Sequence, residues 1–107
     1  MHGALANMGL QLLHNTYNDI MHRIMHEGDG MLPKGTFEAD SAGWELYTVN
    51  TNNHQQTWGV LGGALFALAN WMSSTGNVGA AHFIIYDGDN EVGQGTLASS
   101  RGNMGAD

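Results

Sequence analysis

Apolar residues recur between residues 53 and 74 with the spacing of a helix. Leu61, Leu65, Leu68 and Met72 are four, three and four residues apart, which places them on one face of a 3.6-residue period. Apolar residues also fill most other positions of this segment, and a helix that is apolar nearly all round is normally buried on more than one side. The sequence therefore predicts a central, deeply buried helix. Its uncharged run is shorter than the ~20 apolar residues of a membrane span, so we expect no transmembrane segment.

The ends of this central helix carry local signals. Asn52 or Asn53 is expected to cap its start, with Gln56 completing a capping box three residues after Asn53. Gly76 follows the last apolar residues and is expected to close the helix in a left-handed conformation. These signals predict a helix over residues 53–74.

A second helix, amphipathic in pattern, is predicted over residues 6–27. Leu10, Leu13 and Tyr17 follow the three- and four-residue rhythm of one helical face, and polar residues occupy the opposite face. Gly28 is expected to end it.

Four short runs have the composition and alternation of β-strands, at residues 35–39, 44–49, 81–86 and 91–98. The run at 81–86 is apolar on both faces, which predicts a strand in the interior of the sheet. The element order is α-ββ-α-ββ. We therefore predict a single α+β domain, a two-layer sandwich with two helices packed on a four-stranded, mostly antiparallel sheet, followed by a frayed tail at about 99–107.

Charge narrows the range of partners. The 107 residues include 3 Lys and Arg against 10 Asp and Glu, giving a net charge of −7 with His neutral. Binding to nucleic acid or to anionic lipid depends on Lys and Arg, so the sequence argues against both. The chain has no cysteine, which excludes disulfides and thiolate metal sites. We expect no cofactor.

The compartment is suggested only by composition. A surface poor in Lys and rich in Asn, Gly and Thr favours a secreted protein over a cytoplasmic one. The first fifteen residues lack the basic and apolar regions of a signal peptide, so the chain is expected either to be intracellular or to have lost a signal.

Two histidines on the first helix belong to a pattern that is typical of a metal site. Asp19, His22 and His26 are three and four residues apart, which places them on one helical face where they could hold a divalent metal ion. The HExxH signature is missing, since position 23 is Arg. A solvated polar face explains the same residues without a metal and is the preferred interpretation. A dimer seam with His residues packed across a twofold axis is a third reading.

A polar stretch between the second strand and the central helix is a candidate ligand-binding site, formed by Asn52, Asn53, His54 and Gln55. Free N–H groups at the start of a helix, together with the helix dipole, can bind an anion or a carbonyl oxygen. A histidine can serve as an acid or a base near neutral pH, and His54 is the candidate for that role. Ordinary capping and turn formation is the simpler interpretation.

The candidate catalytic residues are His54, His82 and Tyr86. His82 and Tyr86 lie on one face of the predicted strand at 81–86. Because apolar residues surround His82, we expect it to be buried and neutral. The alternative is an open face on which His82, Tyr86 and Tyr47 line a pocket.

Self-association is also predicted, most simply as a homodimer. Two helices and four short strands leave more apolar surface than a chain of 107 residues can readily hide. Methionine-rich stripes and glycines clustered in the central helix suit close contact with another chain. The candidate contact residues are Met21, Met25, Gly59, Gly63, Phe66 and Trp71.

One resemblance bears on function. The segments NTNNHQQTWGVLGGALFALANWM and HFIIYDGDNEVGQGTL resemble small fungal proteins of uncharacterised function, many of them secreted, and the element order is similar to the killer-toxin-like fold of fungal effectors, here without the usual cysteines. The resemblance implies an effector-like binding module that contacts a protein or a small ligand. The alternative function is a small cofactor-free enzyme or a metal-binding protein that uses His54 and His82, or His22 and His26.

Overall fold

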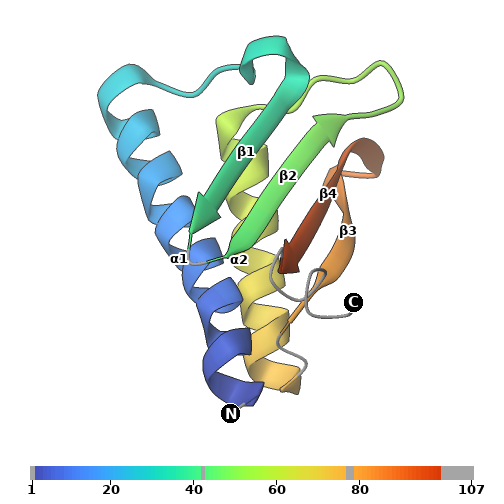
Figure 1. The fold of residues 1–107 in the computed structure, drawn as a ribbon. Helices are drawn as coiled ribbons and strands as arrows, with labels where there is room; N and C mark the ends of the chain where they lie inside the picture. Colours follow the sequence, from blue (N-terminus) through green and yellow to red (C-terminus); the bar gives the residue numbers. More distant parts are fainter. Residues whose placement is uncertain (1, 42, 77–78, 100–107) are drawn as a thin grey trace.

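The computed structural model describes residues 2–41, 43–76 and 79–99. Its elements follow the predicted order α-ββ-α-ββ and build the predicted α+β fold (Figure 1). In chain order they are helix α1 (His2–Glu27), a short 3₁₀ helix (Pro33–Gly35), strands β1 (Thr36–Ser41) and β2 (Trp44–Asn50), helix α2 (Trp58–Thr75), and strands β3 (Ala81–Asp87) and β4 (Asn90–Ser99). The predicted frayed tail falls almost wholly on residues 100–107, outside the described residues.

The sheet has the order β1-β2-β4-β3, and each neighbouring pair is antiparallel. Two hairpins, β1–β2 and β3–β4, are joined through the pairing of β2 with β4. The prediction that the strand at 81–86 lies inside the sheet is therefore wrong, because β3 forms one edge. Its apolar residues are explained by a groove that β3 forms with α2, and not by neighbouring strands on both sides.

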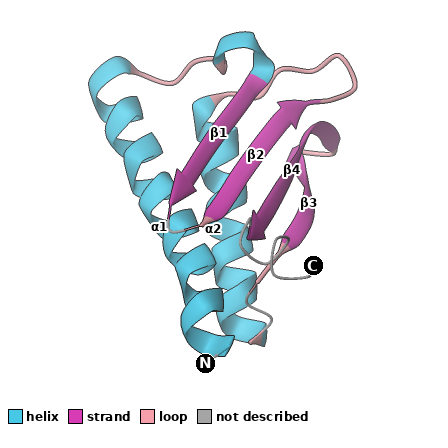
Figure 2. Ribbon diagram, viewed as in Figure 1, coloured by secondary structure: helices cyan, strands magenta, loops and turns pink. Residues whose placement is uncertain are grey.

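The two halves of the chain are arranged alike. Each half is a helix followed by a hairpin, and the sheet order places the second strand of each hairpin at the centre and the first at an edge. Both helices pack on the same face of the sheet (Figure 2). No described element covers the other face, so the molecule has a helical side and an open sheet side.

The core lies between the helices and the sheet. Trp44, Leu46 and Thr48 of β2 face inward and are buried, whereas Glu45 and Tyr47 are exposed, as the alternation in the sequence predicts. From the helices, Leu13 and Ile20 of α1 and Leu61 and Leu65 of α2 fill the same layer. From the second hairpin, Ile85 and Leu97 complete it.

Helix α2 begins later than the sequence predicts. Its N-cap is Thr57, whose side chain accepts a hydrogen bond from the Val60 N–H at 3.2 Å. Asn52 and Asn53 instead have φ values of 57° and 60°, the left-handed conformation of a turn, so neither caps the helix. The predicted end is confirmed: Gly76 has φ 77° and donates its N–H to the carbonyl oxygen of Met72.

Burial of α2 is restricted to one side. Leu61, Leu65 and Met72 face the core and are buried, but Phe66 and Trp71 on the outward side are 48% and 50% exposed. The expectation of burial on more than one side is therefore wrong. The reason is the two-layer architecture, in which α1 and the sheet cover only part of the helix.

Candidate functional site

A groove runs between α2 and the edge strand β3. It encloses about 410 Å³, and its lining contains no charged side chain. The residues that line it are Gly63, Ala64, Ala67 and Leu68 of α2 and Phe83, Ile84 and Tyr86 of β3. An apolar groove of this kind is a typical place for a ligand or another protein to bind.

Exposed side chains extend the groove into a wider surface. Trp71 lies three and four residues beyond Leu68 and Ala67, on the same side of α2. Ile84 and Tyr86 on β3 are 37% and 58% exposed. Phe66 flanks the surface on its other side, where its ring lies 5.3 Å from that of Tyr17 on α1. We call the set Gly63, Phe66, Ala67, Trp71, Ile84 and Tyr86 the α2–β3 surface.

The geometry of β3 and β4 explains why this surface is open. The register of the pair shifts between Ile85 and Tyr86, where Val92 is the extra, unpaired residue of a β-bulge in β4. Phe83 turns inward, and its ring occupies the space where a side chain at Gly95 would lie. The ring of Phe83 on β3 therefore fills the space above Gly95 of β4, while Ile84 and Tyr86 remain at the surface.

The predicted dimer contacts fall into three groups. Gly63, Phe66 and Trp71 lie on the α2–β3 surface, and Gly63 has open space around it. Met21 is partly buried and packs against Gly62, and the carboxylate of Asp29 fills the space where a side chain at Gly59 would lie. The remaining candidate, Met25, is 80% exposed near the end of α1. Two of the three glycines of α2, Gly59 and Gly62, are thus packed against side chains of this chain.

The candidate ligand loop is anchored by its backbone. The His54 N–H donates to the Thr51 carbonyl oxygen, and the Gln56 N–H donates to Oδ1 of Asn50, both at 3.0 Å. Asn52, Asn53, His54 and Gln55 form the exposed turn between these bonds.

The first N–H groups of α2 are also bonded within the chain. Trp58 donates to the Gly30 carbonyl oxygen at 2.9 Å, and Gly59 donates to Oδ1 of Asp29 at 3.0 Å. An acidic side chain near a helix start is favoured by the helix dipole. The free N–H groups on which an anion site would depend are therefore taken up by the segment that follows α1.

The same loop meets β4 through Glu91. The Thr51 hydroxyl donates to Oε2 of Glu91 at 2.7 Å, and the Gln94 side-chain amide donates to the same oxygen at 3.3 Å. These bonds, first that of Thr51 and then that of Gln94, lower the pKa of the Glu91 carboxyl below its usual value, because they favour the charged form. The contact fixes the loop to the sheet.

Gln56 differs from its neighbours in the loop. Its side chain is fully buried over Gly93, and neither its Oε1 nor its Nε2 has a hydrogen-bond partner among the described residues. The buried hydroxyl of Thr48 is in the same state. Because its side chain turns into the core, Gln56 does not form the capping box that the sequence suggested.

Among the described residues, the three candidate catalytic residues do not line a common pocket. Tyr86 lines the α2–β3 groove, whereas His54 is exposed in the loop and His82 is exposed on β3. The prediction that His82 is buried is wrong, because no described element covers the face of the sheet that carries it. Tyr47 pairs with Thr96, which pairs with His82, so an intervening strand separates the two side chains.

Metal-binding residues are likewise not assembled in the described part of the chain, where no group of three or more His, Asp or Glu side chains could hold an ion. His22 and His26 are exposed, with their rings stacked at a centroid distance of 6.5 Å. The guanidinium of Arg23, between them in sequence, lies 4.5 Å from the centre of the Trp58 ring. No described helix is both long and apolar enough to cross a membrane.

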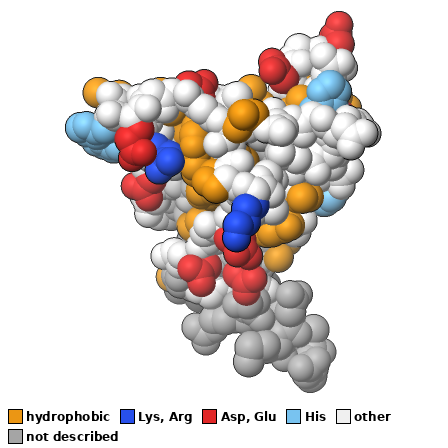
Figure 3. Space-filling view, turned by 90° about the horizontal axis from the view of Figure 1, so that it is seen from above, with side chains coloured by type: hydrophobic (Ala, Val, Ile, Leu, Met, Phe, Trp, Pro, Cys, Tyr) orange, Lys and Arg blue, Asp and Glu red, His pale blue; other side chains and the backbone are white. Residues whose placement is uncertain are grey.

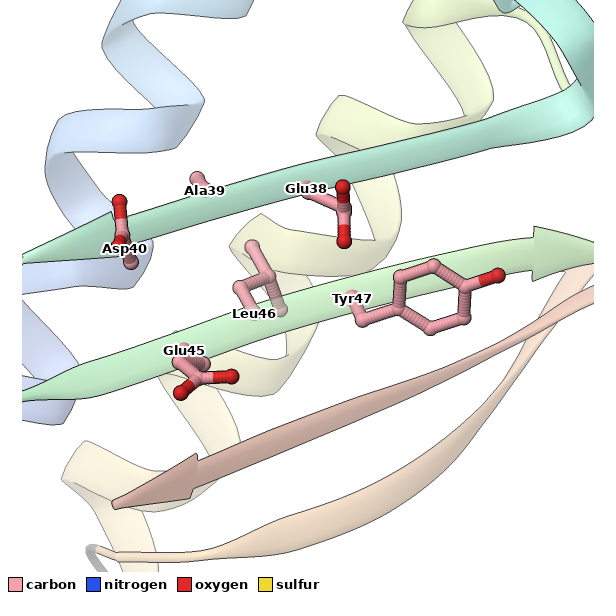
Figure 4. A pocket seen from close by; sticks show the side chains of 6 residues that line it. All are labelled: Glu38, Ala39, Asp40, Glu45, Leu46 and Tyr47. Atoms are coloured by element: carbon pink, nitrogen blue, oxygen red, sulfur yellow. The ribbon is translucent and has the colours of Figure 1, made fainter. Parts of the chain in front are cut away.

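The open face of the sheet is acidic at its β1 edge. A hollow of about 220 Å³ is surrounded by Glu38 and Asp40 of β1 and Glu45 and Tyr47 of β2 (Figure 4). Asp40 and Glu45 pair directly across the two strands, an arrangement of like charges that is unfavourable. The upper end of the molecule also shows acidic side chains near its margins and few basic ones (Figure 3).

Comparison with protein-family models, with curated proteins and with solved structures found no match. The site is therefore defined by its own geometry. The predicted contact residues Gly63, Phe66 and Trp71 lie on the α2–β3 surface, and Ile84 and Tyr86 of the same surface were not among the predicted contacts. The available signal was the run of apolar residues on both faces of the strand, which fits an edge strand that another chain covers as well as it fits an interior strand.

Proposed function

We propose that the protein is a non-catalytic binding module that acts through contact with other protein chains and self-associates through the α2–β3 surface. The observation that carries this proposal is the concentration of exposed apolar side chains there. Of the eight large hydrophobic residues that the described chain exposes, four lie on this surface: Phe66, Trp71, Ile84 and Tyr86. Exposed apolar groups that gather in one place are typical of interaction sites.

Charge supports the same proposal. Helix α2 contains no Asp, Glu, Lys or Arg, although the whole chain carries a net charge of −7. By contrast, the hollow between α1 and β1 is lined by Asp19, Arg23 and Glu38 around an apolar floor. The α2–β3 surface is therefore the place where burial by a partner displaces water from apolar groups without removing water from charges.

Catalysis is ranked below binding because it needs converging groups at defined geometry. His54 and His82 lie on separate exposed segments, and neither lines the α2–β3 groove. An effector-like role, in which the module contacts a protein or a small ligand, is compatible with this surface and stays part of the proposal.

Sedimentation equilibrium at micromolar concentration tests the proposal. The wild-type protein is expected to form a dimer, and Trp71→Gln is expected to weaken association at least tenfold by removing a large apolar contact. Tyr47→Gln is the matched control, since Tyr47 is a similarly exposed aromatic residue on the open sheet face. A wild-type monomer, or equal weakening by both substitutions, would contradict the proposal.

A further inference from the structure

The two edges of the sheet differ in their protection against pairing. Natural edge strands are usually shielded by charged residues, by proline or by a covering segment. Strand β1 follows Pro33 and carries Glu38 and Asp40, so it has such protection. Strand β3 has no proline, no lysine and no acid before Asp87, the last residue of the strand. Among the described residues, its edge beside the α2–β3 groove has none of these protections.

We propose, building on the function proposed above, that a second copy of this chain pairs along the free edge of β3. The two β3 strands run antiparallel across a twofold axis and join the two sheets into one of eight strands. The side of α2 that lines the groove, including Gly63, Ala64 and Ala67, then faces α2 of the other copy. Small residues at such positions allow close approach of two helices.

Electrostatics favour contact between two copies at this edge over contact at the β1 edge or at the open sheet face. Each copy carries −7, so approach through the open sheet face would bring together the carboxylates of Glu38, Asp40 and Glu45. Along β3 the sole acid is Asp87, and antiparallel pairing places it opposite the start of the other strand rather than opposite its equivalent. The β3 edge is thus the edge at which two identical acidic chains meet with the least repulsion.

The symmetry of the proposed contact also limits its size. Pairing of β3 with β3 uses the same surface on both copies, which closes the assembly as a dimer. The edges that remain are the two β1 strands, whose Glu38 and Asp40 would oppose further pairing. The expected product is a dimer and not a filament.

Cysteine cross-linking tests the strand pairing directly, because the chain has no cysteine and each variant carries a single thiol. Cysteine is introduced in turn at positions 81–87, and disulfide formation is followed under mild oxidation. In an antiparallel pair across a twofold axis, a residue meets its own equivalent only near the axis. We expect cross-linking to peak at or next to Ile84, the midpoint of β3, at least tenfold above its ends. Glu38→Cys on the opposite edge is the matched control and is expected not to cross-link.

Amide exchange provides a second measurement that needs no substitution. The outward N–H groups of β3 should become protected as the protein concentration rises, while those of the other edge strand, β1, should not. Each variant is also sedimented under reducing conditions to show that it associates as the wild type does. A peak of cross-linking together with protection of β3 would support the pairing.

The outcomes separate this inference from the proposed function. A dimer in sedimentation without a cross-linking peak and without protection of β3 overturns the edge pairing but leaves self-association standing. A monomer at micromolar concentration overturns both. Uniform cross-linking along positions 81–87, matched by Glu38→Cys, would indicate random collision and would also overturn the pairing.

Discussion

At the scale of single residues, the sequence predicts which side chains alternate along a strand, but it does not predict how the rest of the molecule covers each side chain. The alternation of Trp44, Leu46 and Thr48 with exposed neighbours was predictable, because a strand with one covered face imposes a period of two. The environment of His82 was not predictable, because its apolar neighbours in sequence do not reveal that its face of the sheet is uncovered. Gln56 was likewise read as a capping residue, although its side chain lies in the core.

Gln56 provides the first prediction at this scale. A buried amide without hydrogen-bond partners costs stability, whereas an apolar side chain of similar shape does not. We therefore expect Gln56→Met to raise the free energy of unfolding by about 1 kcal/mol, measured by urea denaturation. Gln55→Met is the matched control, since Gln55 is exposed and should change stability little. A loss of stability in Gln56→Met would show that the amide is hydrogen-bonded, for example to a buried water molecule.

At the scale of secondary structure elements, the existence and order of helices and strands followed from periodicity, but the start of α2 did not. Asn53 and Thr57 are both good N-cap residues, so local sequence does not choose between them. The choice is made by the segment after α1, where Asp29 and the Gly30 carbonyl oxygen accept hydrogen bonds from the first N–H groups of α2. These contacts join residues about 30 positions apart and leave no local signal.

The N-cap gives the prediction at this scale. Thr57→Ala removes the acceptor of the Val60 N–H and is expected to lower the free energy of unfolding by about 1 kcal/mol. Asn53→Gly should leave stability unchanged or slightly raised, because glycine adopts the left-handed conformation of that position without strain. Thermal and urea denaturation measure both. An unchanged Thr57→Ala together with a destabilised Asn53→Gly would place the start of the helix where the sequence alone suggested.

At the scale of the whole molecule, the layers were predictable and the edges were not. Two apolar helix faces and four half-apolar strands combine readily into a helical layer on a sheet. The position of β3 in the order β1-β2-β4-β3 depends on which strand of each hairpin lies at the centre of the sheet. Either strand of a hairpin would bury alternate residues there, so the pattern of the sequence does not decide between them. The candidate surface follows from that choice, because only an edge position lets Ile84 and Tyr86 of β3 line a groove with α2.

The last prediction concerns the salt dependence of self-association. Two copies that each carry −7 repel one another, while the contact surface proposed on α2 contributes no charge of its own. Raising the salt concentration from about 0.01 M to about 0.1 M shortens the screening length from about 30 Å to about 10 Å and weakens this repulsion. The dimer dissociation constant, measured by sedimentation equilibrium, is therefore expected to fall several-fold. A dissociation constant that rises with salt would mean that ion pairs hold the copies together, which would place the contact on a charged part of the molecule instead of on α2 and β3.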